Sequence, residues 1–387
     1  MTTSLTERVD GYNYLSRAIP FATPGRLNRV LAKSPMHRRI YYTLKPYIPR
    51  RLRVAIRRAV ATCQRDAAHA IWPIHHLAAK PPLGWPGWPD GKRFAFVLTH
   101  DVETQEGLDR CRKLAELEMA HGFRSSFNFV PEGDYPIPTE LGTWLSNQGF
   151  EVGVHDLRHD GKLYSSRSVF RKNAKRINAY LKEWKAVGFR SGFMLHELDW
   201  LHDLEVEYDA STFDTDPFEP QADGAGTIFP FWVAPVEGRA SRKGYIELPY
   251  TLPQDSTLFL VFREKTPAIW LDKLDWVAAQ GGMALVNVHP DYLQFPGEAP
   301  GAMTYPVEHF IRLLEHVRNR HTGAYWQALP REVARAVAPY RPCHEIPVSR
   351  GRSLAAPADK CEEPPTPAPV PIRAAWKLVV SQILHIW

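Results

Sequence analysis

Two histidines and two carboxylates have types and spacings that suit a hydrolytic metal site. His155 and His159 are four residues apart, so a single backbone turn would bring both imidazoles to one ion. Asp101 and Glu103 are two residues apart, so both can point to the same side of an extended chain, where one could bind metal and the other act as a base. The set Glu103, His155 and His159 would leave coordination positions open for water. The alternatives are incidental surface histidines and carboxylates that cap the next helix.

A further histidine and an arginine follow other apolar runs. His289 ends the run that starts at Met283, and its pKa lies close enough to neutral pH for it to protonate a departing amine. The alternative is a core histidine bonded to a backbone carbonyl. An aspartate would orient His289 as an acid, although the spacing does not identify which one. Arg190 could hold Asp101 in place or pair with an acidic loop.

Apolar runs typical of buried parallel strands precede these clusters. In a barrel of alternating strands and helices, residues just past the carboxyl ends of the strands face a common mouth, so these side chains would converge. We expect strands at 94–99, 125–130, 150–155, 188–193, 205–209, 228–233, 244–250 and 283–289. Helical patterns cover 106–121, 138–148, 166–187, 266–280 and 304–320, and a last strand and helix lie near 324–338. The alternation predicts an α/β fold with a parallel sheet, most simply a barrel.

Length and composition predict one large domain with extensions at both ends. The 387 residues include 12 Trp and 18 Phe, enough to build a large core. Breaker-rich stretches mark the linkers. The predicted divisions are a basic N-terminal extension with a Pro/Trp-rich linker (1–90), a main domain (91–340), a Pro/Ala-rich linker (341–371) and an amphipathic terminal helix (372–387).

Positive charge is concentrated near the N-terminus. The net charge is +6, and residues 11–65 hold 13 Lys and Arg with no Asp or Glu. An acid-free basic segment typically contacts an anionic surface. No aromatic-basic recognition motif accompanies it, so we expect an anionic membrane surface as the partner and no nucleic acid. The helix at 372–387 would either dock on its own domain or bind a membrane surface or a partner.

Several features favour a cytoplasmic location, with peripheral attachment to the inner membrane as an option. The first 30 residues lack the apolar core and cleavage site of a secretory signal. No run approaches the roughly 18 apolar residues that a membrane-spanning helix needs. The four cysteines match no metal or disulfide spacing and are most simply free thiols of a reducing compartment.

The ordered set of motifs resembles the polysaccharide deacetylase family, the NodB-homology group related to carbohydrate esterase family 4. The set is Thr99 to Glu103, the His155 and His159 pair, the arginine motif Phe189 to Phe193, and Val288-His289. The resemblance covers 91–340 and implies a distorted (β/α) barrel. It also implies one divalent metal, commonly zinc with cobalt, manganese or nickel as alternatives, and hydrolysis of an N-acetyl or O-acetyl group on a sugar.

The resemblance implies a role for each matching residue. Asp101 matches the general base, Arg190 the arginine that orients it, and His289 the general acid; His155 and His159 match the metal-binding histidines. Where the usual first motif has two adjacent aspartates, this chain has Val102, so Glu103 would be the third ligand. The stretch from Tyr208 to Thr212 resembles the segment before the family's substrate loop. A substrate-binding role is therefore expected for Asp209, Asp214 and Asp216.

We therefore expect a metal-dependent hydrolase that removes an acetyl group from an N-acetylated sugar or polysaccharide precursor, in a pathway such as exopolysaccharide biosynthesis. The partner would be an acetylated glycan or its precursor. One alternative keeps the fold and hydrolyses a non-sugar C–N bond. Another is a non-catalytic protein that binds a glycan or assembles a biosynthetic complex. The presence of both Asp101 and His289 argues against a pure binder, which needs neither an acid nor a base.

Overall fold

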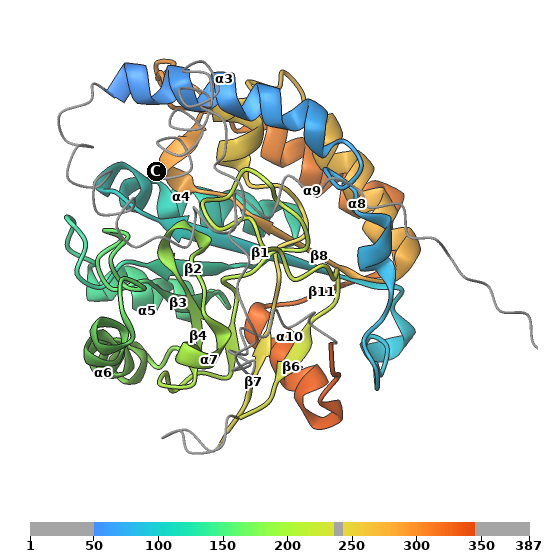
Figure 1. Cartoon of the computed structure of the whole chain (residues 1–387). Coiled ribbons are helices and arrows are strands. Elements are labelled where there is room, and N and C mark those ends of the chain that lie inside the picture. The colour runs from blue at the N-terminus through green and yellow to red at the C-terminus, as the bar shows by residue number, and fades with distance from the viewer. Residues whose placement is uncertain (1–49, 236–242, 345–387) are drawn as a thin grey trace, which may run out of the picture.

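A nine-stranded, mostly parallel sheet carries the residues described above (Figure 1). The structure is a computed structural model that describes residues 50–235 and 243–344. The strands of this sheet are β1 (Phe94–Val102), β2 (Ser126–Phe129), β3 (Glu151–His155), β4 (Gly188–Arg190), β5 (Tyr208–Asp209), β6 (Phe231–Val233), β7 (Tyr245–Glu247), β8 (Met283–Asn287) and β11 (Tyr325–Gln327). Their order is β11-β1-β2-β3-β4-β5-β7-β6, with β8 also paired to β1. The β6–β7 pair is antiparallel and the other pairs are parallel.

The sheet curls, and an irregular segment after β7 returns to β8. The backbone N–H groups of Thr251 and Leu252 donate to the carbonyl oxygen of Leu285 in β8, at 3.0 and 3.1 Å. Because β8 pairs along β1 at the same time, the strands surround a common interior. The predicted α/β class and distorted barrel are confirmed. A short parallel pair, β9 (Leu293–Gln294) and β10 (Tyr305–Pro306), lies outside the main sheet.

Helices pack around the strands. They are α3 (Arg50–Ala68), α4 (Gln105–His121), α5 (Thr139–Asn147), α6 (Arg167–Trp184), α7 (Leu198–Leu201), α8 (Ala268–Gln280), α9 (Glu308–Arg320), α10 (Pro330–Val337) and the π-helix η5 (Ser256–Val261). The helix α6 shows why these segments fold as they do. It buries Phe170, Ala174, Ile177 and Leu181, which recur every three or four residues and face β3. It ends at Trp184, before the predicted 187, because Lys185 adopts the left-handed conformation.

The start of α4 fixes the first acidic cluster. Thr104 is the N-cap residue, and its hydroxyl accepts a hydrogen bond from the backbone N–H of Gly107. The same hydroxyl donates to Asp291 at 2.6 Å. Thr104 therefore caps this helix, and the alternative that Asp101 or Glu103 caps it is wrong. Both carboxylates stay available for chemistry.

Helix α3, from the basic segment, packs on the main domain instead of extending into solvent. It runs along one end of the molecule in Figure 1 and contacts η5. The guanidinium of Arg58 donates twice to the carbonyl oxygen of Leu260, at 3.0 and 2.9 Å. Arg65 pairs with Glu264 at 2.6 Å. Two arginines of the basic segment 11–65 are therefore bound to the chain's own domain.

The Pro/Trp-rich linker at 81–89 is also anchored. The Trp88 side chain is buried, and its indole N–H donates to the carbonyl oxygen of Gly281 at 2.8 Å. Trp85 packs edge-on against Trp88, with ring centroids 4.7 Å apart. Large aromatic side chains bury much apolar surface, so these two contacts hold the linker against the domain.

Two predicted segments lie outside the described residues. They are the Pro/Ala-rich linker beyond residue 344 and the amphipathic helix at 372–387, which both stay predictions. Within 50–235 and 243–344, no helix combines the length and the apolar character needed to cross a bilayer.

Candidate active site

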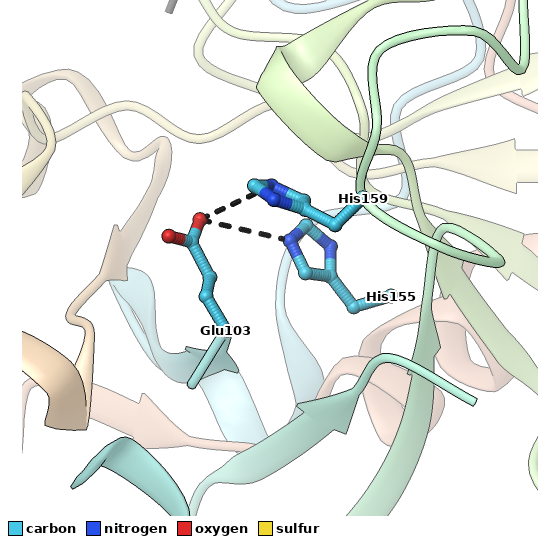
Figure 2. Close-up of side chains that lie close together, drawn as sticks. All are labelled: Glu103, His155 and His159. Atoms are coloured by element: carbon cyan, nitrogen blue, oxygen red, sulfur yellow. Dashed lines mark ion pairs between the residues drawn. The ribbon is translucent and has the colours of Figure 1, made fainter. Parts of the chain in front are cut away.

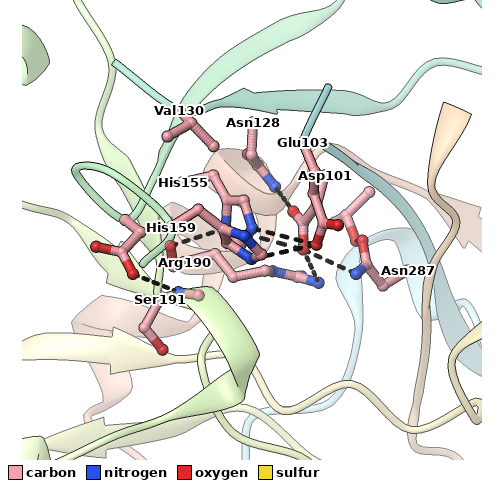
Figure 3. A network of polar contacts seen from close by, with 12 residues as sticks. Asp101, Glu103, Asn128, Val130, His155, His159, Arg190, Ser191 and Asn287 are labelled. Carbon is pink, nitrogen blue, oxygen red and sulfur yellow. Dashed lines mark hydrogen bonds and ion pairs between the residues drawn. The ribbon is translucent and has the colours of Figure 1, made fainter. Parts of the chain in front are cut away.

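A cavity at the carboxyl ends of the strands brings the predicted clusters together. It encloses about 770 Å³ of space between its walls, part of it open solvent. Its lining includes Asp101, Glu103, His155, His159 and His289. Arg190 lies fully buried beside Asp101, just behind this lining (Figure 3). The three residues predicted to take part in catalysis and the three predicted to bind metal therefore lie in one place.

Glu103, His155 and His159 direct their donor atoms toward one another (Figure 2). One ligand atom from each lies within 4.8 Å of the others. The Oε1 atom of Glu103 is 3.2 Å from Nε2 of His159 and 3.9 Å from Nε2 of His155. Burial alone would raise the pKa of Glu103, but the two histidines hold it well below its usual range, so the carboxylate is charged.

The orientation of His155 is the best sign that this group fits a cation. Its Nδ1–H donates to the backbone carbonyl of Arg190 at 3.1 Å, so in the neutral imidazole the lone pair is on Nε2. This Nε2 is buried and has no hydrogen-bond partner among the described residues. An unsatisfied buried polar atom costs about 1–3 kcal/mol, a cost that coordination to a metal would remove. Two imidazoles and a carboxylate form a donor set suited to zinc.

The loop that carries His159 is strained and closely packed. His159 has a φ of 52°, a left-handed conformation that is unfavourable for a residue with a side chain. Its ring stacks on Phe193, with centroids 4.4 Å apart. A Cβ on Gly192 would lie 2.8 Å from the His159 ring and 2.6 Å from the Asp156 carboxylate. Gly192 of the arginine motif is therefore needed so that the second imidazole can approach the site.

Asp101 is held as a charged carboxylate. Its Oδ1 accepts a hydrogen bond from Asn128 at 2.9 Å, and its Oδ2 accepts one from Asn287 at 2.8 Å. The Nη1 atom of Arg190 lies 3.6 Å from the same Oδ2 (Figure 3). Burial by itself would raise the pKa of Asp101, but Arg190, His155 and His289 lower it to about 2. Asp101 is thus ionised at neutral pH and ready to accept a proton.

His289 is oriented by Asp255, a residue in the irregular segment before η5. The Nδ1–H of His289 donates to Oδ1 of Asp255 at 2.6 Å, and its backbone N–H donates to Oδ2 at 2.8 Å. Tyr305 also donates to Oδ2, at 3.1 Å. Burial would lower the pKa of His289, but the charge of Asp255 outweighs it, and together with Glu103 and Asp101 raises this pKa to about 10. His289 is therefore protonated at neutral pH and presents Nε2 to the cavity.

The three aspartates predicted to bind substrate do not reach the cavity, so that prediction is corrected. Asp209, Asp214 and Asp216 are at most 1% exposed and are absent from the cavity lining. Each carboxylate already has a partner inside the protein. Asp209 accepts a hydrogen bond from Ser211, and Asp216 accepts one from Tyr250. Asp214 binds the buried ammonium of Lys273 at 2.8 Å. These bonds stabilise the irregular segment that forms one side of the site.

Sequence patterns missed several residues of the site. Asn128 and Asn287 are buried polar residues in otherwise apolar strands, a signal that could have identified them. Asp255 and Glu219 lie in a segment without helix or strand periodicity, so no pattern marked them. Arg57 lines the cavity from α3, although the basic composition around it suggested a surface role.

A second group of possible ligands lies away from the cavity. Asp275 of α8 accepts hydrogen bonds from His316 and His321 at 2.8 and 2.7 Å. Arg320 also binds this carboxylate, at 2.9 Å. A guanidinium already on the carboxylate disfavours a second cation, so this group is best described as a brace between α8 and the end of α9.

Comparisons with known proteins agree with the architecture. No protein-family model matches the sequence, and no curated protein matches it significantly. The structure is similar to that of a candidate polysaccharide deacetylase from Mycobacterium smegmatis, with a TM-score of 0.51 and 19% sequence identity. That alignment covers 68% of this chain and 96% of the other.

Two further solved structures resemble the chain less closely. One is a candidate polysaccharide deacetylase from Pseudomonas aeruginosa PAO1, with a TM-score of 0.46, 14% identity and coverage of 66% and 95% of the two chains. The other is a CE4 family pseudoenzyme from Bacillus anthracis, with a TM-score of 0.38, 13% identity and coverage of 64% and 67%. The geometry of the barrel and the likeness to the mycobacterial structure lead to one conclusion: this chain has the fold of the polysaccharide deacetylases.

Proposed function

We propose that this protein is a metal-dependent hydrolase that removes an acetyl group from an N-acetylated sugar or polysaccharide precursor. The observation that carries the proposal is the complete set of groups in one cavity. A charged carboxylate, Asp101, lies beside a donor set for a cation, and a protonated histidine, His289, lies two residues past the end of β8 of the same sheet. Amide hydrolysis needs such a base and such an acid.

Glu103, His155 and His159 would hold the cation. When bound, a divalent cation supplies Lewis-acid chemistry, since it polarises a carbonyl and lowers the pKa of water. Asp101 accepts the proton that the attacking water loses. Because its pKa is about 2, Asp101 is a weak base, and it depends on the water being acidified. Asn128, Asn287 and Arg190 keep its two oxygens in place, as described above.

His289 completes the reaction. Its Nε2–H donates a proton to the nitrogen of the sugar as the C–N bond breaks, and the sugar leaves as an amine while acetate remains. Asp255 stabilises the cationic imidazole and fixes which nitrogen faces the cavity. The water therefore contributes its oxygen to the acetyl product; its first proton ends on Asp101, and its second stays on the acetic acid until this ionises in solvent to acetate.

Two rival functions stay open to test. The same groups could hydrolyse a non-sugar amide, because nothing in the base, the acid or the ligands is specific for a sugar. A non-catalytic glycan-binding or assembly protein is the less favoured alternative. It would not need the buried Asp101 and Arg190 pair, which is costly to maintain without a catalytic use.

The test combines metal analysis with a substrate panel. We expect about one divalent ion per chain by mass spectrometry on protein purified without added metal, and acetate release from at least one N-acetyl sugar. Release from simple amides, with none from sugars, would favour the amidohydrolase. Bound metal without release from any substrate would favour the glycan-binding protein.

The pair of His289 and Asp255 predicts a specific pH dependence. An acid must be protonated, so turnover should fall as the pH rises through the raised pKa of His289. This fall is the alkaline limb of the kcat–pH profile. In Asp255→Asn the alkaline limb should move to lower pH by about one unit or more, since an adjacent opposite charge shifts a pKa by roughly 1–3 units. The kcat–pH profile checks this, with Tyr305→Phe as a control that keeps the Asp255 charge. An unmoved alkaline limb in Asp255→Asn would contradict the assignment.

Attachment to an anionic membrane surface also stays a proposal. It rests on the basic composition of residues 11–49 and the apolar spacing within 372–387. Helix α3 contributes less to it than the sequence suggested, because Arg58 and Arg65 are engaged within the domain. Sedimentation of the full chain with anionic vesicles tests it: no binding at low salt would overturn the proposal.

A further inference from the structure

One wall of the active-site cavity is built by a segment outside the predicted main domain. Arg57 of α3 lines the cavity together with Leu260 and Val261 of η5. The neighbouring arginine, Arg58, ties α3 to the carbonyl of Leu260 by two hydrogen bonds. Arg57 is half-buried, so its position is set by packing as well as by the helix. Helix α3 is therefore part of the wall of this cavity.

A group of polar residues surrounds this wall. Glu219 lines the cavity and is 5% exposed, and its Oε1 accepts hydrogen bonds from Tyr250 at 2.9 Å and from Gln254 at 2.5 Å. Tyr250 also lies 2.9 Å from Asp216. Burial and the charge of Asp216 raise the pKa of Glu219 to about 8, although the charge of Arg57 acts in the opposite direction. At neutral pH Glu219 is mostly protonated and adds little negative charge.

The charges that line the cavity are unevenly distributed. The carboxylates of Asp101 and Glu103 and the imidazoles of His155, His159 and His289 belong to the proposed reaction site. Arg57 is the only Arg or Lys among the described residues of the lining, and it belongs to a different wall. Ser256 adds a hydroxyl to that wall. A planar guanidinium is suited to bidentate binding of carboxylate or phosphate.

We propose that Arg57 binds an anionic substituent of the sugar, a carboxylate or a phosphate, and so selects acidic glycans or glycan phosphates as substrates. This inference rests on the proposed function, because it names the substrate class of the same cavity. Recognition of charge by a single arginine acts on binding, so its effect appears mainly in affinity and KM. Arg57 takes no part in the proton transfers.

The test measures binding of three related probes to the metal-loaded full chain by calorimetry. N-acetylglucosamine is the neutral probe, its 1-phosphate is the phosphate probe, and N-acetylmuramic acid is the carboxylate probe. We expect at least one anionic probe to bind about tenfold or more tightly than the neutral sugar. The anionic probe with the larger advantage identifies whether phosphate or carboxylate is the natural group.

Three variants test whether Arg57 causes the tighter binding of the anionic probe. Arg57→Gln should lose most of it, and Arg57→Lys should retain part, because lysine keeps the charge without the planar fork. Arg65→Ala, which removes an arginine of the same helix that pairs with Glu264 outside the cavity lining, should keep the wild-type preference. Thermal melting of each variant shows that α3 still docks.

The outcomes separate this inference from the proposed function. Equal affinity of the wild-type protein for all three probes overturns the inference. So does an anionic advantage that survives in Arg57→Gln, since the anion would then be binding the cation. If no probe is deacetylated but the preference depends on Arg57, the inference stands and the deacetylase proposal fails.

Discussion

Replacing His155 with alanine is expected to remove the bound metal and, with it, acetate release. The Nε2 of this histidine is buried and makes no hydrogen bond to the described residues, so coordination to a cation would satisfy it. Loss of an outer partner of a metal ligand already costs roughly 10–100-fold in affinity, and loss of a direct ligand should cost more. Metal content after dialysis, by mass spectrometry, and turnover per folded molecule check this.

A control and two further variants make that result specific. His69→Ala removes an exposed imidazole near the end of α3 and should keep the full metal content. His159→Ala and Glu103→Gln should resemble His155→Ala, because the donor atoms of all three residues lie within 4.8 Å of one another. Full occupancy in both histidine variants would show that the cation, if any, binds elsewhere.

Asp101→Asn is expected to keep the metal and lower turnover by about 10² or more, the usual scale for removing a general base. An amide cannot accept the proton of the attacking water. The substitution also leaves Arg190 without its carboxylate and places an amide opposite the donors of Asn128 and Asn287. Breaking a buried charge pair from one side costs about 3–5 kcal/mol, so the melting temperature should fall as well.

Turnover of Asp101→Asn must therefore be measured well below its melting temperature and corrected for the folded fraction. Glu103→Gln is the contrasting variant, because its activity should fall together with its metal content. A normal rate in folded, metal-loaded Asp101→Asn would remove the base assignment. Loss of metal in Asp101→Asn would instead indicate that Asp101 is a ligand.

The alternation of the chain predicted much of the fold, for a simple physical reason. Apolar residues recur with different periods in buried parallel strands and in amphipathic helices, so the strands could be predicted from the sequence. Strand β1 shows how the predicted strands located the site. Asp101 and Glu103 share one side of the chain, whereas His100, directly before Asp101, points into the core and binds Glu118 at 2.7 Å. The clusters that follow β1, β3 and β8 met as expected because parallel strands end at the same edge.

Side-chain partners across the irregular segment 210–265 could not be predicted from local pattern. Asp255 precedes His289 by 34 residues and follows no period, so only the folded chain identifies it as the partner. Asp214 suggested a substrate contact, but Lys273 of α8 binds it in the interior. The role of Arg57 was hidden for a similar reason, since the packing of α3 on η5, and not charge composition, decides where that side chain lies.

Arg190 contacts both a proposed metal ligand, His155, and the proposed base, Asp101, from one position in β4. Its carbonyl oxygen orients His155, and its side chain lies beside Asp101. The two roles are separable: a side-chain substitution affects only the base, because the main-chain carbonyl remains. A slip of β4 by one residue would be different, since it moves every side chain to the opposite face of the sheet and also displaces the carbonyl. This strand should therefore not tolerate insertion or deletion in evolution.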